Sequence, residues 1–277
     1  MRDGYYIIRT YEAGKIGEKT KFFVPGTRSD TVRGRRREQS AIKKQEQNEY
    51  SSTKALARLL NANAKTLTVM IGLDYSDAGL AAVTARAKAD AKAAGKSWRR
   101  LKRTEKEDYI HEAASHEAEL CLRRVGRACR EKGLPFSYVV VTSDRDGETG
   151  EAVRVHHHLI VSAGCEQIFV DKWERLGGVN AKAMREQDDY YVVAKYLMAQ
   201  VRRIEDAKKY RSSRNLVRVA PKDRVVSSGA VMRVPKGGQL LYMAETGPYM
   251  PQYMRYVLPR DRWRRYGPSE FDGEDEE

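Results

Sequence analysis

The sequence predicts an α+β protein, and three observations support this class. Two runs rich in β-branched and aromatic residues, 136–142 and 153–161, have the composition of buried strands. The polar stretch 143–151 between them predicts that they form an antiparallel hairpin. Residues 104–133 instead carry apolar residues at steps of three and four, which predicts a helix with one buried face.

Shorter signals predict the elements that come before this helix. Leucines on one side of 48–63 indicate a helix, and 66–72 is a β-rich run. Ser76 and Asp77 offer N-caps for an alanine-rich helix that ends near Gly95. These signals place a strand between two helices.

The later elements have signals of their own. Thr104 and Glu107 have the spacing of a capping box, and Gly133 marks the end of the long helix. A further apolar stripe predicts a helix over 189–209. Residues 215–258 return to β character, with breaks at proline and glycine.

Composition narrows the class of partner. The chain has 277 residues, a net charge of +14 and a pI of about 9.6, which favours an anionic partner such as nucleic acid. No apolar run approaches the ~20 residues that span a bilayer, and the N-terminus lacks the apolar core of a signal peptide. The three cysteines are scattered, which fits a reducing compartment. We therefore expect a cytoplasmic protein without a membrane partner.

Two basic segments are candidate DNA-contacting regions. The first segment, residues 33–37, lies in a polar stretch that continues to Gln47. The second, residues 97–103, has a tryptophan next to its basic residues. Each also has a plainer interpretation: a solvated segment in the first case, and a tryptophan packed into the core in the second. The candidate residues are Arg35, Arg36, Arg37, Trp98, Arg99 and Arg100.

Three consecutive histidines lie in the second predicted strand. Because side chains alternate along a strand, His156 and His158 share one face and His157 points to the other. Two imidazoles two residues apart on a rigid face can chelate one divalent metal ion. The competing interpretation is a surface strand that carries these histidines by chance. We favour the metal site, because two histidines share one face of a strand whose composition is that of a buried strand. His157 is expected to be a packed core residue.

A two-histidine metal site needs a further ligand and an open position for substrate. The loop after residue 142 supplies four acids, of which Asp144 is nearest to the strand and is our candidate. The alternative for each acid is a solvated turn. His111 and His116, five residues apart on the long helix, are expected to be surface histidines.

A tyrosine on the next helix offers a nucleophile for a metal-polarised phosphodiester. Tyr196 lies beside the apolar residue Leu197, on the side of the helix that carries Gln200. Tyr190 and Tyr191 point more than roughly 100° away around the helix. On the helix alone, Tyr196 also fits a core tyrosine with a bonded hydroxyl.

These features resemble the HUH endonucleases, named for a His-hydrophobic-His strand, and more closely the bacterial and phage rolling-circle replication-associated proteins. The matching pieces extend over most of the chain, and the last is the most specific. They are Leu60-Asn-Ala-Asn-Ala-Lys-Thr-Leu-Thr, Tyr138-Val-Val-Val-Thr, His156-His-His-Leu-Ile, Trp173 with Gly177-Gly178, Val193-Ala-Lys-Tyr-Leu and Ser213-Arg-Asn-Leu.

The resemblance implies a central antiparallel sheet flanked by helices, in a ferredoxin-like layout. It implies that Tyr196 nicks one strand of single-stranded or hairpin origin DNA, with His156 and His158 as ligands of Mg²⁺ or Mn²⁺. The enzyme would remain on the 5′ phosphate through this single tyrosine and free a 3′-OH for a host polymerase. A host helicase would unwind the DNA, because the chain has no Walker loop. The implied location is the cytoplasm of a bacterial host cell.

The chain departs from the family pattern at three positions. Ala199 stands where the family has a lysine near its nucleophile, so Lys195 is our candidate for that role, with Arg202 as the alternative. Ser143 stands where the family has a carboxylate, so Asp144 takes its place as the candidate. His157 replaces an apolar residue.

Other functions remain open on the sequence alone. A relaxase or transposase would use the same chemistry, and a catalytically inactive relative would bind single-stranded DNA through its basic loops alone. Arg214 and Asn215 each fit two roles, contact with DNA and bracing of the sheet. We favour DNA contact for Arg214 and bracing for Asn215. We expect strand pieces and a basic segment in 1–47, the nicking domain with a β elaboration in 48–258, and a basic then acidic tail in 259–277.

Overall fold

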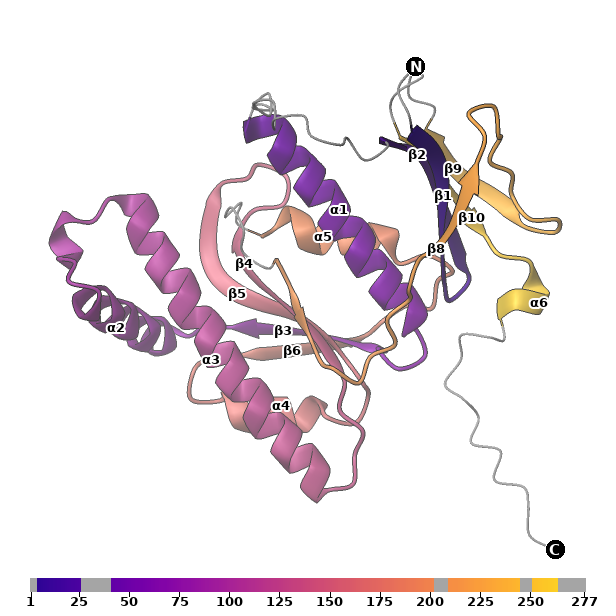
Figure 1. Ribbon diagram of the computed structural model, residues 1–277. Helices are drawn as coiled ribbons and strands as arrows, with labels where there is room; N and C mark the ends of the chain where they lie inside the picture. Colours follow the sequence, from indigo (N-terminus) through magenta and orange to yellow (C-terminus); the bar gives the residue numbers. More distant parts are fainter. Residues whose placement is uncertain (1–3, 26–40, 202–208, 245–250, 264–277) are drawn as a thin grey trace, which may run out of the picture. The chain divides into compact units, whose positions relative to one another are not determined.

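The protein is α+β, as the sequence predicts, with two antiparallel five-stranded sheets and six helices among its described residues (Figure 1). The computed structural model describes residues 4–25, 41–201, 209–244 and 251–263, of which 41–49 by backbone alone. The chain divides into two compact units. The first unit comprises residues 1–65, 186–192 and 217–277, and the second comprises 66–185 and 193–216.

This division differs from the three consecutive regions expected from the sequence. The first unit joins both ends of the chain in one sheet, with strand order β8-β1-β2-β10-β9. The strands are β1 (Gly4–Ala13), β2 (Ile16–Pro25), β8 (Lys222–Val226), β9 (Gln239–Ala244) and β10 (Gln252–Val257). Pairing between strands more than 200 residues apart leaves no local signal in the sequence, so the expected boundaries at 47 and 258 do not match the compact units.

Two helices complete the first unit. α1 (Ala41–Ala62) covers the predicted helix and begins earlier, and α6 (Arg260–Trp263) is a single turn. The β1–β2 turn passes close to the end of α1: a Cβ at Gly14, whose φ is 58°, would lie 2.2 Å from the carbonyl oxygen of Asn61. Glycine is therefore required at this turn, both for its backbone conformation and for the close approach.

The sheet of the second unit has the order β6-β3-β5-β4-β7. Its strands are β3 (Val69–Asp74), β4 (Tyr138–Arg145), β5 (Ala152–Val161), β6 (Val179–Ala183) and β7 (Arg211–Ser212). β4 and β5 form the predicted antiparallel hairpin. β5, the histidine strand, is the central strand and is bonded on both edges, which fixes the direction of its side chains.

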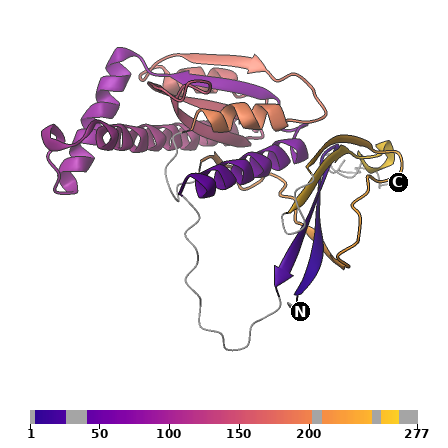
Figure 2. The same ribbon diagram turned by 90° about the horizontal axis from the view of Figure 1, so that it is seen from above.

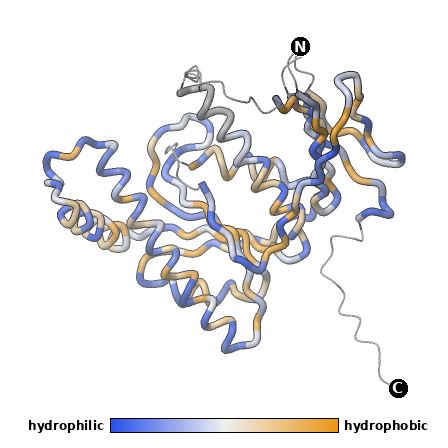
Figure 3. The backbone as a smooth tube through the Cα atoms, in the orientation of Figure 1, coloured by the Kyte–Doolittle hydropathy of each residue, from blue (hydrophilic) through white to orange (hydrophobic). Residues whose placement is uncertain are grey.

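Helices α2 (Asp77–Ala93), α3 (Arg103–Glu131) and α4 (Glu166–Trp173) contribute to the main core with this sheet. α3 runs beside the sheet (Figure 2), and hydrophobic and hydrophilic residues alternate along it (Figure 3), as expected for a helix with one buried face. The predicted cap of α2 is confirmed, because the Ser76 hydroxyl accepts a hydrogen bond from the amide of Gly79. The predicted capping box of α3 is wrong by two residues: Glu105 accepts from the amide of Lys102.

α5 (Tyr191–Ala199) carries the candidate nucleophile. It is shorter than the predicted helix over 189–209, and residues 202–208 lie outside the described residues. Its residues from Val193 onward belong to the second unit, together with the histidine strand.

Candidate metal and nucleophile site

The predicted alternation of the three histidines is confirmed. His156 and His158 lie on one face of β5, with ring centroids 4.8 Å apart and Nε2 atoms 3.1 Å apart. His157 lies on the other face and is fully buried. Strand geometry alone therefore brings two imidazole nitrogens to one point.

The hydrogen bond from Nδ1 of His156 places the lone pair of this imidazole on Nε2, the atom that faces His158. The Nδ1 atom of His156 lies 2.9 Å from the backbone carbonyl oxygen of Arg154. A carbonyl oxygen only accepts hydrogen bonds, so Nδ1 carries the proton and Nε2 carries the lone pair. This is the form in which histidine binds metals.

A third potential ligand approaches from the end of α5. The side-chain oxygen Oε1 of Gln200 lies 3.0 Å from Nε2 of His158. This amide oxygen only accepts, so Nε2 of His158 donates to it and carries a proton, which a bound cation would displace. Three donor atoms, from His156, His158 and Gln200, therefore meet on one face of the sheet. Burial, followed by the neighbouring His156, lowers the pKa of His158, which favours the neutral form that ligates.

The donor set fits a divalent cation, because two imidazoles and an amide oxygen suit ions such as Mn²⁺ and leave coordination positions open. The sequence pattern placed Gln200 on the side of Tyr196 but did not identify it as a ligand. The spacing of four residues between Tyr196 and Gln200 was the signal that could have identified Gln200, because residues four apart on a helix are neighbours on its surface. Asp74, opposite His156 on β3, is an exposed carboxylate on the same face that the sequence pattern did not identify either.

Asp144 does not fit the predicted role of third ligand. Its Oδ2 lies 3.6 Å from Nδ1 of His111 on α3, the helix whose Ser115 contacts Thr142. Thr142 contacts His157, so the contact of Asp144 with α3 places Asp144 on the His157 face of the sheet. His111 is correspondingly not the surface residue expected, since its side chain is only 14% exposed.

The remaining loop acids follow the plainer interpretation. Asp146 Oδ1 accepts hydrogen bonds from the backbone amides of Glu148 and Thr149, as in an Asx turn. These amides hold the pKa of Asp146 below its usual value, led by the amide of Thr149. The loop also comes close to the site: a Cβ at Gly147 would lie 3.2 Å from Cγ of Gln200.

Tyr196 lies beside the two imidazoles. Its ring centroid is 5.9 Å from that of His158, and 53% of the residue is exposed. It is not the core tyrosine of the alternative interpretation. Tyr190 is 4% exposed, and the ring of Tyr191 lies 4.0 Å from the guanidinium of Arg255 within the first unit. Lys195, the candidate for the lysine role, is exposed on α5.

His157 is held by a continuous hydrogen-bonded chain on the opposite face. Its Nδ1 lies 3.1 Å from Oγ1 of Thr142, and its Nε2 lies 2.9 Å from Oη of Tyr75. Ser115 donates to Thr142, and Tyr75 donates to the carbonyl of Ala114, so the chain begins and ends on α3. One direction of donation satisfies every member, with Nε2 of His157 protonated. Burial is the main cause that lowers the pKa of His157 to about 3.

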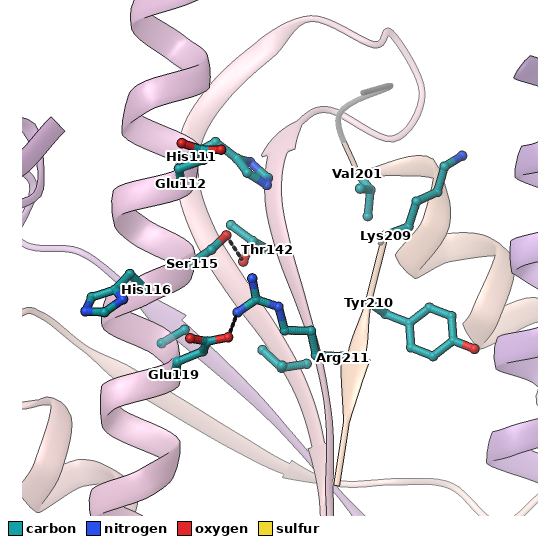
Figure 4. A pocket seen from close by; sticks show the side chains of 12 residues that line it. His111, Glu112, Ser115, His116, Glu119, Thr142, Val201, Lys209, Tyr210 and Arg211 are labelled. Atoms are coloured by element: carbon teal, nitrogen blue, oxygen red, sulfur yellow. Dashed lines mark hydrogen bonds and ion pairs between the residues drawn. The ribbon is translucent and has the colours of Figure 1, made fainter. Parts of the chain in front are cut away.

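A cavity of about 540 Å³ lies between α3, β4 and β7 (Figure 4). Thr142 lines it, so it lies on the His157 side of the sheet, away from the site of His156 and His158. Figure 4 shows Arg211 reaching across to Glu119, with which it forms an ion pair. The charges of Arg211 and Glu119 in this cavity thus offset each other.

The predicted DNA-contacting residues are spread over the chain. Trp98, in the short 3-10 turn Trp98–Arg100, packs against the main core, while Arg99 and Arg100 are exposed. Arg214 is exposed, and the side-chain amide of Asn215 donates to Phe136 and Ser137, which confirms its bracing role. Arg35, Arg36 and Arg37 lie outside the described residues.

Comparison with known proteins adds no relative: no family model, no curated protein and no solved structure matches the chain.

Proposed function

We propose that this protein nicks one strand of DNA through Tyr196, as a replication initiator of the HUH type that the sequence resembles. One observation carries the proposal: the exposed ring of Tyr196 lies beside a pair of histidines. The centroid of this ring is 5.9 Å from that of His158, and the Nε2 atoms of His158 and His156 are 3.1 Å apart. A nucleophile and a metal-binding pair on one face form a minimal site for phosphoryl transfer.

His156, His158 and Gln200 would hold the divalent cation, Mg²⁺ or Mn²⁺. When bound, this ion would stabilise charge on the phosphoryl oxygens of the DNA. The backbone of Arg154 supports this role by fixing the proton of His156 on Nδ1, away from the site.

Tyr196 performs the covalent step. Its Oη forms a bond to phosphorus while the bond from phosphorus to the 3′ oxygen breaks. The phenolic proton leaves and the departing 3′ oxygen gains a proton, so the products are a 5′-phosphotyrosine and a free 3′-OH. The exposure of Tyr196 supports this assignment, because DNA must reach the hydroxyl. Lys195 remains a candidate for stabilising charge beside it.

The net charge of +14 supports a nucleic-acid substrate. The proposed substrate is single-stranded or hairpin origin DNA in the cytoplasm of a bacterial host, whose helicase and polymerase would extend the freed 3′-OH. Within the described parts of the chain, none of the helices combines the length and apolar character needed to cross a membrane.

The test uses a pool of single-stranded oligonucleotides that tile the DNA element carrying the gene, each labelled at its 3′ end. Incubation with Mn²⁺ and separation on a denaturing gel should show the label attached to the protein. The adduct should disappear in Tyr196→Phe and persist in Tyr191→Phe, the matched control whose ring packs on Arg255.

Two results would redirect the proposal. An adduct that survives Tyr196→Phe would move the nucleophile to another residue. Tight binding without any adduct would favour the catalytically inactive DNA-binding protein, the alternative that Ala199 at the family's lysine position supports. A relaxase or transposase would give the same adduct and would be distinguished by the nicked sequence.

A further inference from the structure

A second cavity, in the first unit, has a charged wall and an apolar floor. It has a volume of about 420 Å³ and opens on one face of the sheet β8-β1-β2-β10-β9. Its floor includes Ile8, Met232 and Tyr256, three buried members of one hydrophobic cluster. A cavity of this size accommodates a nucleotide-sized group.

The strand register gathers cations on this face. Thr10 of β1 pairs with Lys19 of β2 on one side and with Lys222 of β8 on the other. Arg224 pairs with Ile8, two residues away on the same face. Residues far apart in the sequence therefore place three cationic side chains on one face of the sheet, Lys19 and Lys222 in one row and Arg224 in the neighbouring row.

The charge of the cavity is not balanced by its acids. Five cationic residues line it against two carboxylates, Glu12 and Asp223. Arg262 donates to Glu12 at 3.0 Å, and Arg9 holds Asp223 through two hydrogen bonds of 2.8 and 2.7 Å. Within the described residues, neither Lys222 nor Arg224 has an ion pair with an acid.

Lys19 shows the effect of this crowding. Burial, followed by the nearby guanidinium of Arg224, lowers the pKa of its ammonium group. Its Nζ donates to the carbonyl oxygen of Arg233 at 2.6 Å rather than to a carboxylate. A bound anion would relieve the repulsion between these groups.

We propose that this cavity binds a backbone phosphate of single-stranded nucleic acid, with Lys19, Lys222 and Arg224 as its contacts. Val231, which is 67% exposed, and Pro235 line the cavity beside the cations and offer an apolar surface for the sugar or base. Arginine and lysine are the principal phosphate contacts of nucleic-acid-binding proteins. The inference concerns binding alone and does not depend on nicking by Tyr196.

The experiment measures binding of a fluorescent oligothymidine to the full chain by anisotropy over a range of salt concentrations. All proteins carry Tyr196→Phe, so nicking cannot consume the probe. The double variant Lys222→Ala, Arg224→Ala should bind about tenfold more weakly at low salt. Its salt dependence should also fall, by about 0.7 in the logarithmic slope for each phosphate that the variant no longer neutralises.

The matched control is Lys65→Ala with Lys88→Ala, which removes the same charge from two exposed positions outside the cavity. It should change the affinity and the slope much less. Equal effects of the two double variants would overturn the proposal and reduce the cavity to a part of the general positive field. Thermal unfolding of both variants checks that each is folded.

A second probe distinguishes phosphate recognition from contacts to bases. An oligothymidine with an uncharged methylphosphonate backbone should bind weakly and equally to the parent and to the cavity variant. If the cavity variant loses affinity for this uncharged strand as well, phosphate is not the group that the cavity recognises.

Discussion

The two faces of β5 show how position alone gives one residue type two roles. His156 and His158 lie on the face where Tyr196 is exposed, and their Nε2 atoms face each other. His157, between them in the sequence, is fully buried, and both of its ring nitrogens are engaged by hydroxyl groups. We propose that His156 and His158 bind a cation, whereas the hydrogen bonds of His157 hold the strand against α3.

The difference lies in what satisfies each nitrogen. On the His157 face, Thr142 and Tyr75 occupy both nitrogens, so none remains for a ligand. On the other face, the carbonyl of Arg154 occupies only Nδ1 of His156. A histidine with one nitrogen bonded to the backbone is oriented for ligation, while one with both nitrogens bonded is a structural crosslink.

The largest expected effect is on the ligand face. His158→Ala should reduce Mn²⁺ affinity and the rate of adduct formation by at least about 100-fold, because it removes a direct ligand. The free energy of unfolding should change by less than about 1 kcal/mol, as is usual for a partly exposed residue. Calorimetric Mn²⁺ titration and urea unfolding measure the two effects, with His116→Ala as the control. Unchanged Mn²⁺ binding would remove His158 from the site.

The buried face should respond in the opposite way. His157→Ala should lower the free energy of unfolding by about 3 kcal/mol, because it leaves a cavity and deprives the buried hydroxyl of Tyr75 and the half-buried hydroxyl of Thr142 of a partner. Urea unfolding at neutral pH in the presence of EDTA measures this. His157→Gln, which keeps polar atoms in the space, should recover part of the loss. Equal stability of His157→Ala and the parent would show that the network does not support the fold.

Gln200 sharpens the description of the ligand face. Gln200→Ala should weaken Mn²⁺ binding about tenfold, because it removes the proposed third ligand, an amide oxygen, while both imidazoles remain. Gln200→Glu should strengthen Mn²⁺ binding, since a carboxylate adds charge to the donor set. If neither substitution changes the affinity, Gln200 only orients His158.

The smallest expected effect tests the independence of the two faces. Thr142→Val should lower the free energy of unfolding by about 1 kcal/mol, the usual contribution of one hydrogen bond, and should leave Mn²⁺ affinity unchanged. Thr142→Ser, which keeps the hydroxyl, should be closer to the parent in stability. A loss of Mn²⁺ affinity in Thr142→Val would show that the network on the buried face also sets the positions of the ligands.

Local patterns predicted most elements of the second unit. Composition was sufficient for β4 and β5, capping residues and alanine content for α2, and apolar steps of three and four for α3. Each of these elements contributes to the same core. α4 and β6 were missed, since each is short and has no distinct start signal. The pairing of β1 with β8 was also beyond a local pattern, because its partners are separated by most of the chain.

By itself, the sequence determined which histidines share a face, since alternation along a strand depends only on backbone geometry. The sequence also indicated Tyr196 as the candidate nucleophile, because it lies on a predicted helix that comes after the histidine strand. The tertiary structure alone decided the other neighbours of His156 and His158, the pair that we propose to bind the metal. The register of β4 against β5 turned Asp144 toward α3, and the end of α5 brought Gln200 to His158. Register and helix docking arise from non-local packing, which a residue's own neighbours in the sequence do not specify.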